Sequence, residues 1–182
     1  TFGDAEEGFT KMKAGFVVDV THPCSNDIPR WKDSGMFQGM DKSRLSSYGD
    51  LFGALVNLPG ANDSAGQWFM PFDWGATSIT YRTDLVDLEG KAESWEMLFD
   101  PRYKGKIAVI DSAADTWYCM AILAGVDIAK PLTGEDIDKT NALMKKLRPQ
   151  VRMFTNDMTS LQQAIASGEI VMALTWNETP VA

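Results

Sequence analysis

The 182-residue sequence is poor in the residues on which metal and nucleophilic chemistry depend. Its two cysteines, Cys24 and Cys119, lie far apart without a Cys-x-x-Cys or Cys/His spacing, which argues against a metal cluster. A disulfide stays open, because sequence alone does not place their Cα atoms within bonding range; two separate reduced thiols are the favoured interpretation. The one histidine, His22, has no Gly-x-Ser-x-Gly motif to accompany it, so a hydrolase triad is not indicated.

Long apolar runs and basic stripes are also missing. No apolar run approaches the roughly 18–20 residues that cross a bilayer. The sequence begins with neither Met nor a basic stretch followed by an apolar one, so we expect no signal peptide in this chain, whether it is mature or truncated. The formal net charge of −8 argues against a nucleic-acid binder. A net negative charge suits the binding of a cationic ligand, but it is equally common in proteins whose surface charge serves only their solubility.

The residues that are present predict an α/β protein. With 45% hydrophobic and 23% charged residues, the composition is typical of a soluble globular chain, and its length permits one or two domains. The start of the chain predicts a helix at 4–13, a β-branched strand at 16–20, a polar loop at 21–27 and a helix at 28–34. Such alternation favours a sheet with its ligand site at the carboxyl ends of the strands.

The second half repeats this alternation. Ser94 is expected to cap a short helix, and Ile137, Leu143 and Leu147 are expected to face inward from an amphipathic helix. The predicted helices lie at 95–99, about 113–124, 135–147 and 159–167, and the predicted strands at 106–110, 151–154 and 170–175.

Four motifs occur in order across nearly the whole chain. DKSRL stands at 41–45, FDWGAT at 72–77, SWEMLFDPRYKG at 94–105, and SGE at 167–169 leads to TWN at 175–177. Together they resemble the bacterial spermidine/putrescine-binding proteins, which are the extracellular solute-binding subunits of ABC importers. One such match could arise by chance, whereas four in the same order point to the family.

The resemblance implies an α/β, two-lobed, periplasmic-binding-protein-like (type II) fold that closes on its solute like a hinge. Measured against the family, the chain lacks the N-terminal strand–helix unit and a C-terminal part of roughly one hundred residues. We expect residues 1–77 to form part of lobe 1, 78–175 to form lobe 2, and 176–182 to cross back towards lobe 1. A truncated lobe 1 would expose an apolar edge and favour a dimer or a swapped dimer.

The resemblance also implies ligand-binding residues. A polyamine needs aromatic faces for its methylenes and cations, and carboxylates or carbonyls for its ammonium protons. Trp176 matches the family tryptophan that stacks on the ligand; packing under the hinge is the alternative. Glu178 would either add an acceptor or face water. Trp74 lies at the other crossing, where hinge packing is favoured over ligand contact.

Two loops complete the predicted site. The loop DSAAD at 111–115 matches the family pattern Asp-Asp-x-x-Glu, whose second and last acids bind ammonium groups. Ser112 replaces the second acid, and Asp115 stands in for the glutamate with a shorter reach. Helix capping and dipole stabilisation are the alternative role of Asp115. The loss of one charge weakens the polyamine assignment.

The second loop matches the family pattern P-S-T-Y. Cys24 takes the serine position, Ser25 follows it, and Asn26 takes the tyrosine position. Ligand contact is favoured here, and a solvent-exposed turn with a buried thiol is the alternative. Catalysis by Cys24 with His22 is disfavoured, because proximity in sequence does not supply the required geometry.

We therefore expect a periplasmic substrate-binding component of an ABC importer. It would capture a polyamine or related small amine between its lobes and deliver it to permease subunits in the membrane, with no cofactor, metal, nucleic acid or catalysed reaction. Dispersed tyrosines argue against ferric-ion binding. The nearest alternative is a binding protein for a zwitterionic or neutral amine. A second alternative is a ligand sensor, which would share the same fold. A small α/β enzyme with His22 or Asp111 as general base is a distant alternative.

Overall fold

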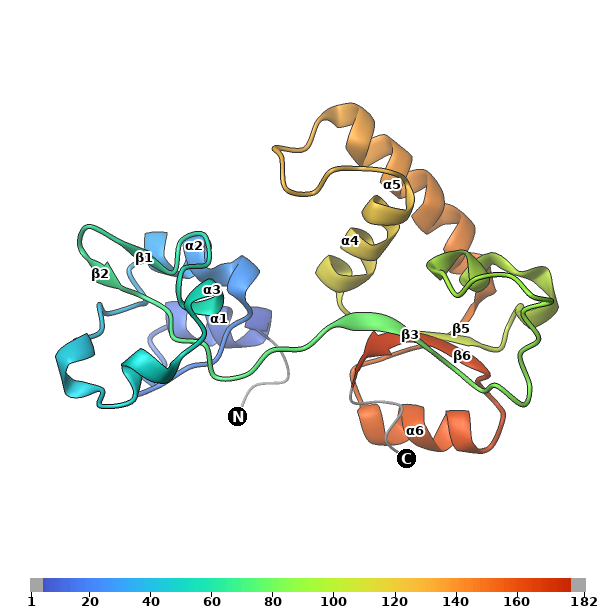
Figure 1. The fold of residues 1–182 in the computed structure, drawn as a ribbon, viewed down its shortest axis with the longest axis horizontal. Coiled ribbons are helices and arrows are strands. Elements are labelled where there is room, and N and C mark those ends of the chain that lie inside the picture. Colours follow the sequence, from blue (N-terminus) through green and yellow to red (C-terminus); the bar gives the residue numbers. More distant parts are fainter. Residues whose placement is uncertain (1–4, 178–182) are drawn as a thin grey trace. The chain divides into compact units, whose positions relative to one another are not determined.

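The computed structural model describes residues 5–177, and the chain divides into two compact units, Thr1–Trp74 and Gly75–Ala182 (Figure 1). Between residues 5 and 177, no helix has both the length and the apolar character needed to cross a membrane. The assignment of 1–77 and 78–175 to two lobes, with 176–182 as a crossing, stays a prediction. Glu178 lies outside the described residues, as does the rest of 178–182.

The first unit is built from short helices around a small apolar core. Phe9 meets Trp31 edge-on with ring centroids 5.6 Å apart, and Ile28, three residues before Trp31, is fully buried. Pro29 sits in the first turn of its helix, where a missing N–H costs nothing. The elements are α1 (Ala5–Lys13), α2 (Ile28–Asp33), α3 (Gly53–Val56), the 3₁₀ turns η1 (Ser25–Asp27), η2 (Lys42–Arg44) and η3 (Tyr48–Asp50), and an antiparallel hairpin of β1 (Asn62–Asp63) and β2 (Gly66–Gln67).

The predicted strand at 16–20 is wrong. These residues form no strand, and Val17 and Val20 are each 87% exposed. A β-branched run becomes a strand only where a neighbouring strand satisfies its backbone groups. Within the described part of the first unit, the hairpin strands β1 and β2 pair with each other and offer this segment no ladder.

The second unit is a four-stranded sheet with helices on both faces. Its strand order is β3 (Thr77–Tyr81), β6 (Met172–Trp176), β4 (Ile107–Ile110), β5 (Val151–Thr155). β3 runs antiparallel to β6, whereas β6, β4 and β5 are mutually parallel. The central strands β4 and β6 are almost entirely buried, as continuous apolar strands covered on both faces must be.

Side chains alternate between the two faces of this sheet. Val109 and Leu174 pack into a core shared with α4 (Ala113–Leu123) and α5 (Gly134–Leu147). Ala108 and Ala173 point the other way, towards α6 (Met158–Ala166). Figure 1 shows α4 and α5 on one side of the sheet and α6 on the other.

The predicted elements of the second unit are confirmed with shifts of one or two residues at their ends. The short helix after Ser94 is the 3₁₀ helix η4 (Trp95–Phe99), and the Ser94 hydroxyl oxygen accepts a hydrogen bond from the Glu96 N–H at 3.1 Å. Two further 3₁₀ turns are η5 (Pro101–Tyr103) and η6 (Arg148–Gln150).

The prediction that Ile137 faces inward from α5 is wrong, because its side chain is 42% exposed. Thr140 is buried instead, its hydroxyl satisfied by donating to the Asp136 carbonyl at 2.8 Å.

Candidate ligand-binding site

The carboxyl ends of β4 and β6 lie side by side in the sheet. The two strands are parallel neighbours, with Ile107 paired to Met172 and Val109 to Leu174. β4 therefore runs into its following loop next to the place where β6 ends at Trp176. Ligand sites of open α/β sheets gather at this edge.

Ser112 and Asp115 are positioned at this edge by the start of α4. Ser112 is the N-cap residue in extended conformation, and its hydroxyl oxygen accepts a hydrogen bond from the Asp115 N–H at 3.4 Å. The loop is also tied to its neighbour, because the Asn156 amide donates to the Asp111 carbonyl at 3.0 Å. Asp115 consequently stands in the first turn of α4, where the helix dipole favours a carboxylate.

Asp115 and Trp176 are hydrogen-bonded to each other. The indole Nε1–H of Trp176 donates to the Asp115 Oδ2 at 3.4 Å, and both side chains are partly buried. A negative group and an aromatic ring thus meet at adjacent strand ends. This is the pair of groups that a desolvated ammonium with an attached methylene chain requires.

The Asp115 carboxylate affects the pKa of Cys119, which lies one turn further along α4. Burial raises the pKa of Cys119 to about 11, and the nearby Asp115 carboxylate contributes in the same direction. Cys119 is 5% exposed. It therefore belongs to the core beneath the edge and is held as a neutral thiol at physiological pH.

The first unit carries its candidate residues in the loop that precedes α2. Cys24, Ser25 and Asn26 are exposed, with Cys24 as the N-cap residue of η1. Pro23 is the buried member of this loop, so the alternative of a turn with a buried thiol is wrong. The 3₁₀ turn closes through the Asp27 N–H, which donates to the Cys24 carbonyl at 3.0 Å.

His22 links this loop to the segment that carries Trp74. Its Nε2 lies 3.3 Å from the Asp73 Oδ1, and its ring meets Phe72 edge-on with centroids 5.5 Å apart. Trp74 itself is 75% exposed. The predicted residues thus fall in two sets: Cys24–Asn26 and Trp74 belong to the first unit, and Ser112, Asp115 and Trp176 belong to the second.

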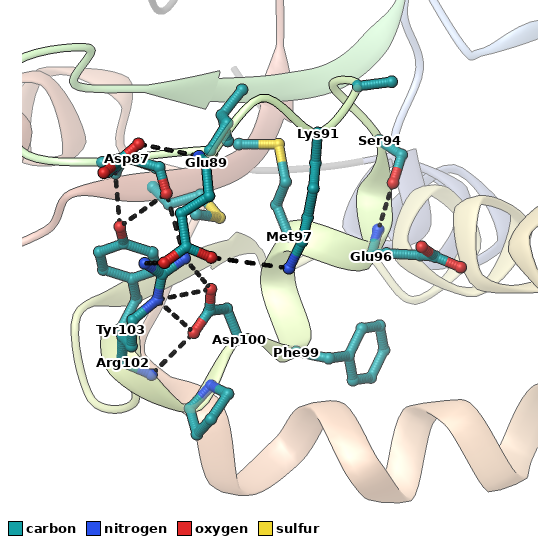
Figure 2. Close-up of a pocket in the computed structure, with 15 residues that line it drawn as sticks. Asp87, Glu89, Lys91, Ser94, Glu96, Met97, Phe99, Asp100, Arg102 and Tyr103 are labelled. Carbon is teal, nitrogen blue, oxygen red and sulfur yellow. Dashed lines mark hydrogen bonds and ion pairs between the residues drawn. The ribbon is translucent and has the colours of Figure 1, made fainter.

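A cavity of about 500 Å³ lies at the opposite edge of the sheet, where β6 begins at Met172. The basic side chains Arg102 and Lys91 pair with carboxylates that line it (Figure 2). Arg102 donates to both carboxylate oxygens of Asp100, to Glu89 at 3.0 Å and to the Asp87 carbonyl at 3.1 Å. The hydrogen bonds from Arg102 hold the pKa of Asp100 below its ordinary value. We interpret this network as a scaffold for the SWEMLFDPRYKG segment.

Metal chemistry has little support among the described side chains. In the stretch 5–177, no group of three or more His, Cys, Asp or Glu residues is placed to hold a metal ion.

A comparison with known proteins identifies the family of the chain. The model of the family described as "Bacterial extracellular solute-binding protein" matches residues 6–180. The chain belongs to this family. The resemblance drawn from the four motifs is thereby confirmed.

The relatives of this solute-binding protein include polyamine binders by name. It is 27% identical over 179 residues to the spermidine/putrescine-binding periplasmic protein of Escherichia coli (strain K12), covering 97% of this chain and 50% of that protein. It is 25% identical over 189 residues to the putrescine/agmatine-binding protein of Pseudomonas aeruginosa, covering 98% and 51%. The chain thus spans about half the length of the curated relatives it matches.

Solved structures confirm the predicted type II fold. A putative spermidine/putrescine ABC transporter protein from Listeria monocytogenes superposes with a TM-score of 0.84 at 22% identity, covering 99% of this chain and 54% of that one. The periplasmic binding protein MotA from A. tumefaciens B6, in complex with glucopine, gives a TM-score of 0.75 at 21% identity, covering 97% and 53%. At such identities the likeness establishes the fold alone.

Sequence reasoning missed two positioning residues of this solute-binding protein. The residue types around His22 suggest at most a catalytic group, whereas in the structure this side chain contacts Phe72 and Asp73. In sequence Asn177 is only the last residue of the TWN motif, whereas in the structure its side chain accepts a hydrogen bond from the Ala76 N–H at 3.0 Å. Asp73 and Asn177 belong to the sequence motifs, but a motif does not reveal which distant residues its side chains contact.

Proposed function

We propose that this chain is part of the substrate-binding component of an ABC importer, and that it captures a polyamine or related small amine between two lobes. The observation that carries the proposal is the hydrogen-bonded pair of Asp115 and Trp176 at the adjacent carboxyl ends of β4 and β6. The carboxylate accepts ammonium protons, and the ring covers methylenes and attracts the cation, a contribution of about 0.5–2 kcal/mol.

Each predicted residue has a role in this proposal. Ser112 orients Asp115 by capping α4, and Trp176 stacks on the ligand. In the first unit, Cys24, Ser25 and Asn26 supply exposed polar contacts and Trp74 a second aromatic face. Glu178, which follows the described residues, adds an acceptor. A neutral or zwitterionic amine is the closest competing solute, because Ser112 stands where the family has an acid.

The partners and location follow from the same role. The loaded protein delivers its solute to permease subunits in the membrane, acts outside the cytoplasm, and leaves the solute chemically unchanged. It uses no cofactor and binds no nucleic acid. Names of relatives such as the periplasmic spermidine/putrescine-binding protein of Escherichia coli support this location.

The deciding experiment is native mass spectrometry of the purified chain with and without spermidine and putrescine. We expect one amine to be retained at micromolar concentration and to be released unchanged in mass. Trp176→Phe should weaken binding at least several-fold, because it removes the hydrogen bond to Asp115 and reduces the aromatic face. A chain that retains no amine in any form would overturn the proposal.

A matched control separates loss of the site from loss of one tryptophan. Trp117 also donates its indole N–H to a single side-chain oxygen, that of Asn141 at 3.2 Å, but it faces α5. Trp117→Phe therefore removes the same kind of hydrogen bond from the same unit. Amine binding should be retained in Trp117→Phe and weakened in Trp176→Phe; equal losses in both would indicate a general effect on folding.

A further inference from the structure

The segment between β2 and β3 carries Trp74 but forms no helix or strand of its own (Figure 1). Phe72 is 84% exposed and Trp74 is 75% exposed, so burial contributes little to holding them in place. Among the residues that the structure describes, the hydrogen bonds and ion pairs of residues 70–75 reduce to one contact, between Asp73 and His22. The position of Trp74 therefore depends on how firmly this contact holds.

His22 attaches the segment at two adjacent residues. Its Nε2 lies 3.3 Å from the Asp73 Oδ1, and its ring meets the Phe72 ring edge-on with an interplanar angle of 77°. The loop of His22 is itself anchored, because the next residue, Pro23, is buried and the loop leads through η1 into α2, which buries side chains in the core. His22 thus connects the core of the first unit to the segment that carries Trp74.

The strength of this contact depends on the charge of the imidazole. Histidine is the side chain whose charge ordinarily changes between pH 5 and 8. A neutral imidazole offers Asp73 at most one hydrogen bond, whereas a protonated imidazole adds the attraction of opposite charges. Both side chains are more than half exposed, so water and salt screen this attraction. We expect protonation to shift the equilibrium between the attached and the free segment by about two- to fivefold.

The groups around His22 leave Asp73 as its electrostatic partner. Asp73 is the one charged residue of the segment 70–75, and within residues 5–177 His22 forms an ion pair with no other carboxylate. On its own loop, the Asp27 carboxyl interacts electrostatically with Arg30, and Cys24 carries a thiol, a group that is ordinarily neutral below about pH 8. The pH dependence of the contact is therefore that of one imidazole facing one carboxylate.

We propose that His22 is a positioning residue that holds Trp74 through Asp73 and Phe72, and that it holds this segment more firmly when its imidazole is protonated. Trp74 and the loop residues Cys24–Asn26 are the ligand contacts of the first unit in the proposed function, so this inference rests on that function. A segment that is already held in place loses less conformational freedom when a ligand binds. Amine binding should then be tighter at pH 5.5 than at pH 7.0, although an alkylamine stays protonated at both.

The first test needs no ligand. The heteronuclear NOE of the backbone amides measures the order of residues 72–74 at pH 5.5 and at pH 7.0. In the wild-type chain this NOE should be higher at pH 5.5. Asp73→Asn should lower it and remove its pH dependence. Asp50→Asn, which removes an exposed carboxylate elsewhere in the first unit, is the matched control and should behave like wild type.

Two variants of His22 separate the charge of this residue from its hydrogen bond. A lysine keeps its positive charge at both pH values, so His22→Lys should lose the pH dependence while retaining part of the order that the ion pair gives. A glutamine stays neutral and still donates a hydrogen bond. At both pH values, His22→Gln should therefore show the lower order that the wild type has at pH 7.0.

Isothermal titration calorimetry with putrescine supplies the second readout. The wild-type chain should bind putrescine about two- to fivefold more tightly at pH 5.5 than at pH 7.0, relative to the change in His22→Gln over the same range. An equal change in both proteins would overturn the positioning role in binding.

The two readouts distinguish this inference from the proposed function. If the NOE of residues 72–74 is equal in wild type, Asp73→Asn and His22→Gln at both pH values, His22 does not hold the segment and the inference is overturned. If the NOE changes as expected but putrescine binds to none of the proteins, the proposed function fails while the pH-dependent contact stands.

Discussion

Asn177 clamps the backbone of Ala76, although the two residues are 101 positions apart. The Asn177 Oδ1 accepts a hydrogen bond from the Ala76 N–H at 3.0 Å, and the Asn177 N–H donates to the Ala76 carbonyl at 3.1 Å. Ala76 immediately precedes β3, and Asn177 immediately follows β6. The clamp therefore extends the β3–β6 ladder beyond its last pair, Thr77 with Trp176, and fixes the backbone that carries Trp176.

The clamp predicts a steric requirement at Gly75. A Cβ atom at this position would lie 2.9 Å from the Asn177 Oδ1, closer than real side chains approach. Gly75→Ala should therefore break the clamp or displace the strand ends, and lower the free energy of unfolding by roughly 1–3 kcal/mol, as overpacking does. Urea denaturation monitored by circular dichroism measures the loss.

A double-mutant cycle isolates the contact. Asn177→Ala alone should cost about 1 kcal/mol, the value of one hydrogen bond. In that background the clashing oxygen is gone, so Gly75→Ala should become nearly neutral. Additive costs in the double variant would show that Gly75 is required for another reason.

Asp63 organises the hairpin of the first unit and predicts its acid sensitivity. Its carboxylate pairs with the Lys32 ammonium and accepts hydrogen bonds from the Trp68 indole at 3.0 Å and the Ala65 N–H at 2.8 Å. The bond from Lys32, followed by those from Trp68 and Ala65, holds the pKa of Asp63 well below its ordinary value. A depressed carboxyl pKa stabilises the fold above the unfolded-state value of about 3.9.

Asp63→Asn should therefore destabilise the first unit at pH 7. The difference from wild type should shrink as the pH falls below about 4, because wild type loses its contribution as it takes up a proton. Asp33→Asn removes an exposed charge at the end of α2 and serves as the control. Hydrogen exchange at residues 62–67 at pH 7 locates the effect; unchanged exchange there would contradict the assignment.

The start of α5 offers a third prediction. Thr133 and Asp136 form a capping box, in which the Thr133 hydroxyl oxygen accepts from the Asp136 N–H at 3.2 Å and the Asp136 carboxylate accepts from the Thr133 N–H at 2.9 Å. Thr133→Ala should lower the free energy of unfolding by about 1 kcal/mol. Thr133→Ser keeps the hydroxyl and should restore most of it. Urea unfolding of both variants checks this, and equal losses would exclude the cap as the cause.

The second unit was predictable from sequence because its signals are local. Buried strands such as β4 and β6 appear as short apolar runs, and the helices between them carry caps and a 3.6-residue period. The segment 16–20 shows the limit of such signals. Its β-branched residues have strand propensity, but a strand exists only with a partner, and the described part of the first unit supplies none to it.

Sequence motifs marked the residues of the candidate site, but they did not predict the contacts between them. Motifs marked Ser112, Asp115 and Trp176, and the parallel pairing of β4 with β6 brings them together. The bond between Asp115 and Trp176 joins residues 61 positions apart. Its geometry depends on the sheet register and on the cap at Ser112, and neither can be read from residue types alone.

The last prediction concerns the two thiols, which differ sharply in environment. Cys24 is exposed on its loop, whereas Cys119 is buried in α4, with a pKa raised to about 11 by burial and, to a lesser degree, by the Asp115 charge. Because the thiolate is the reactive form, the Cys24→Ser variant should react with Ellman's reagent at pH 7.5 only after denaturation, whereas Cys119→Ser should react while native. Asp115→Asn should leave Cys119 protected, since burial is the larger cause. Rapid modification of native Cys24→Ser would mean that α4 opens readily, and the edge formed by Asp115 and Trp176 would then not be preorganised for its ligand.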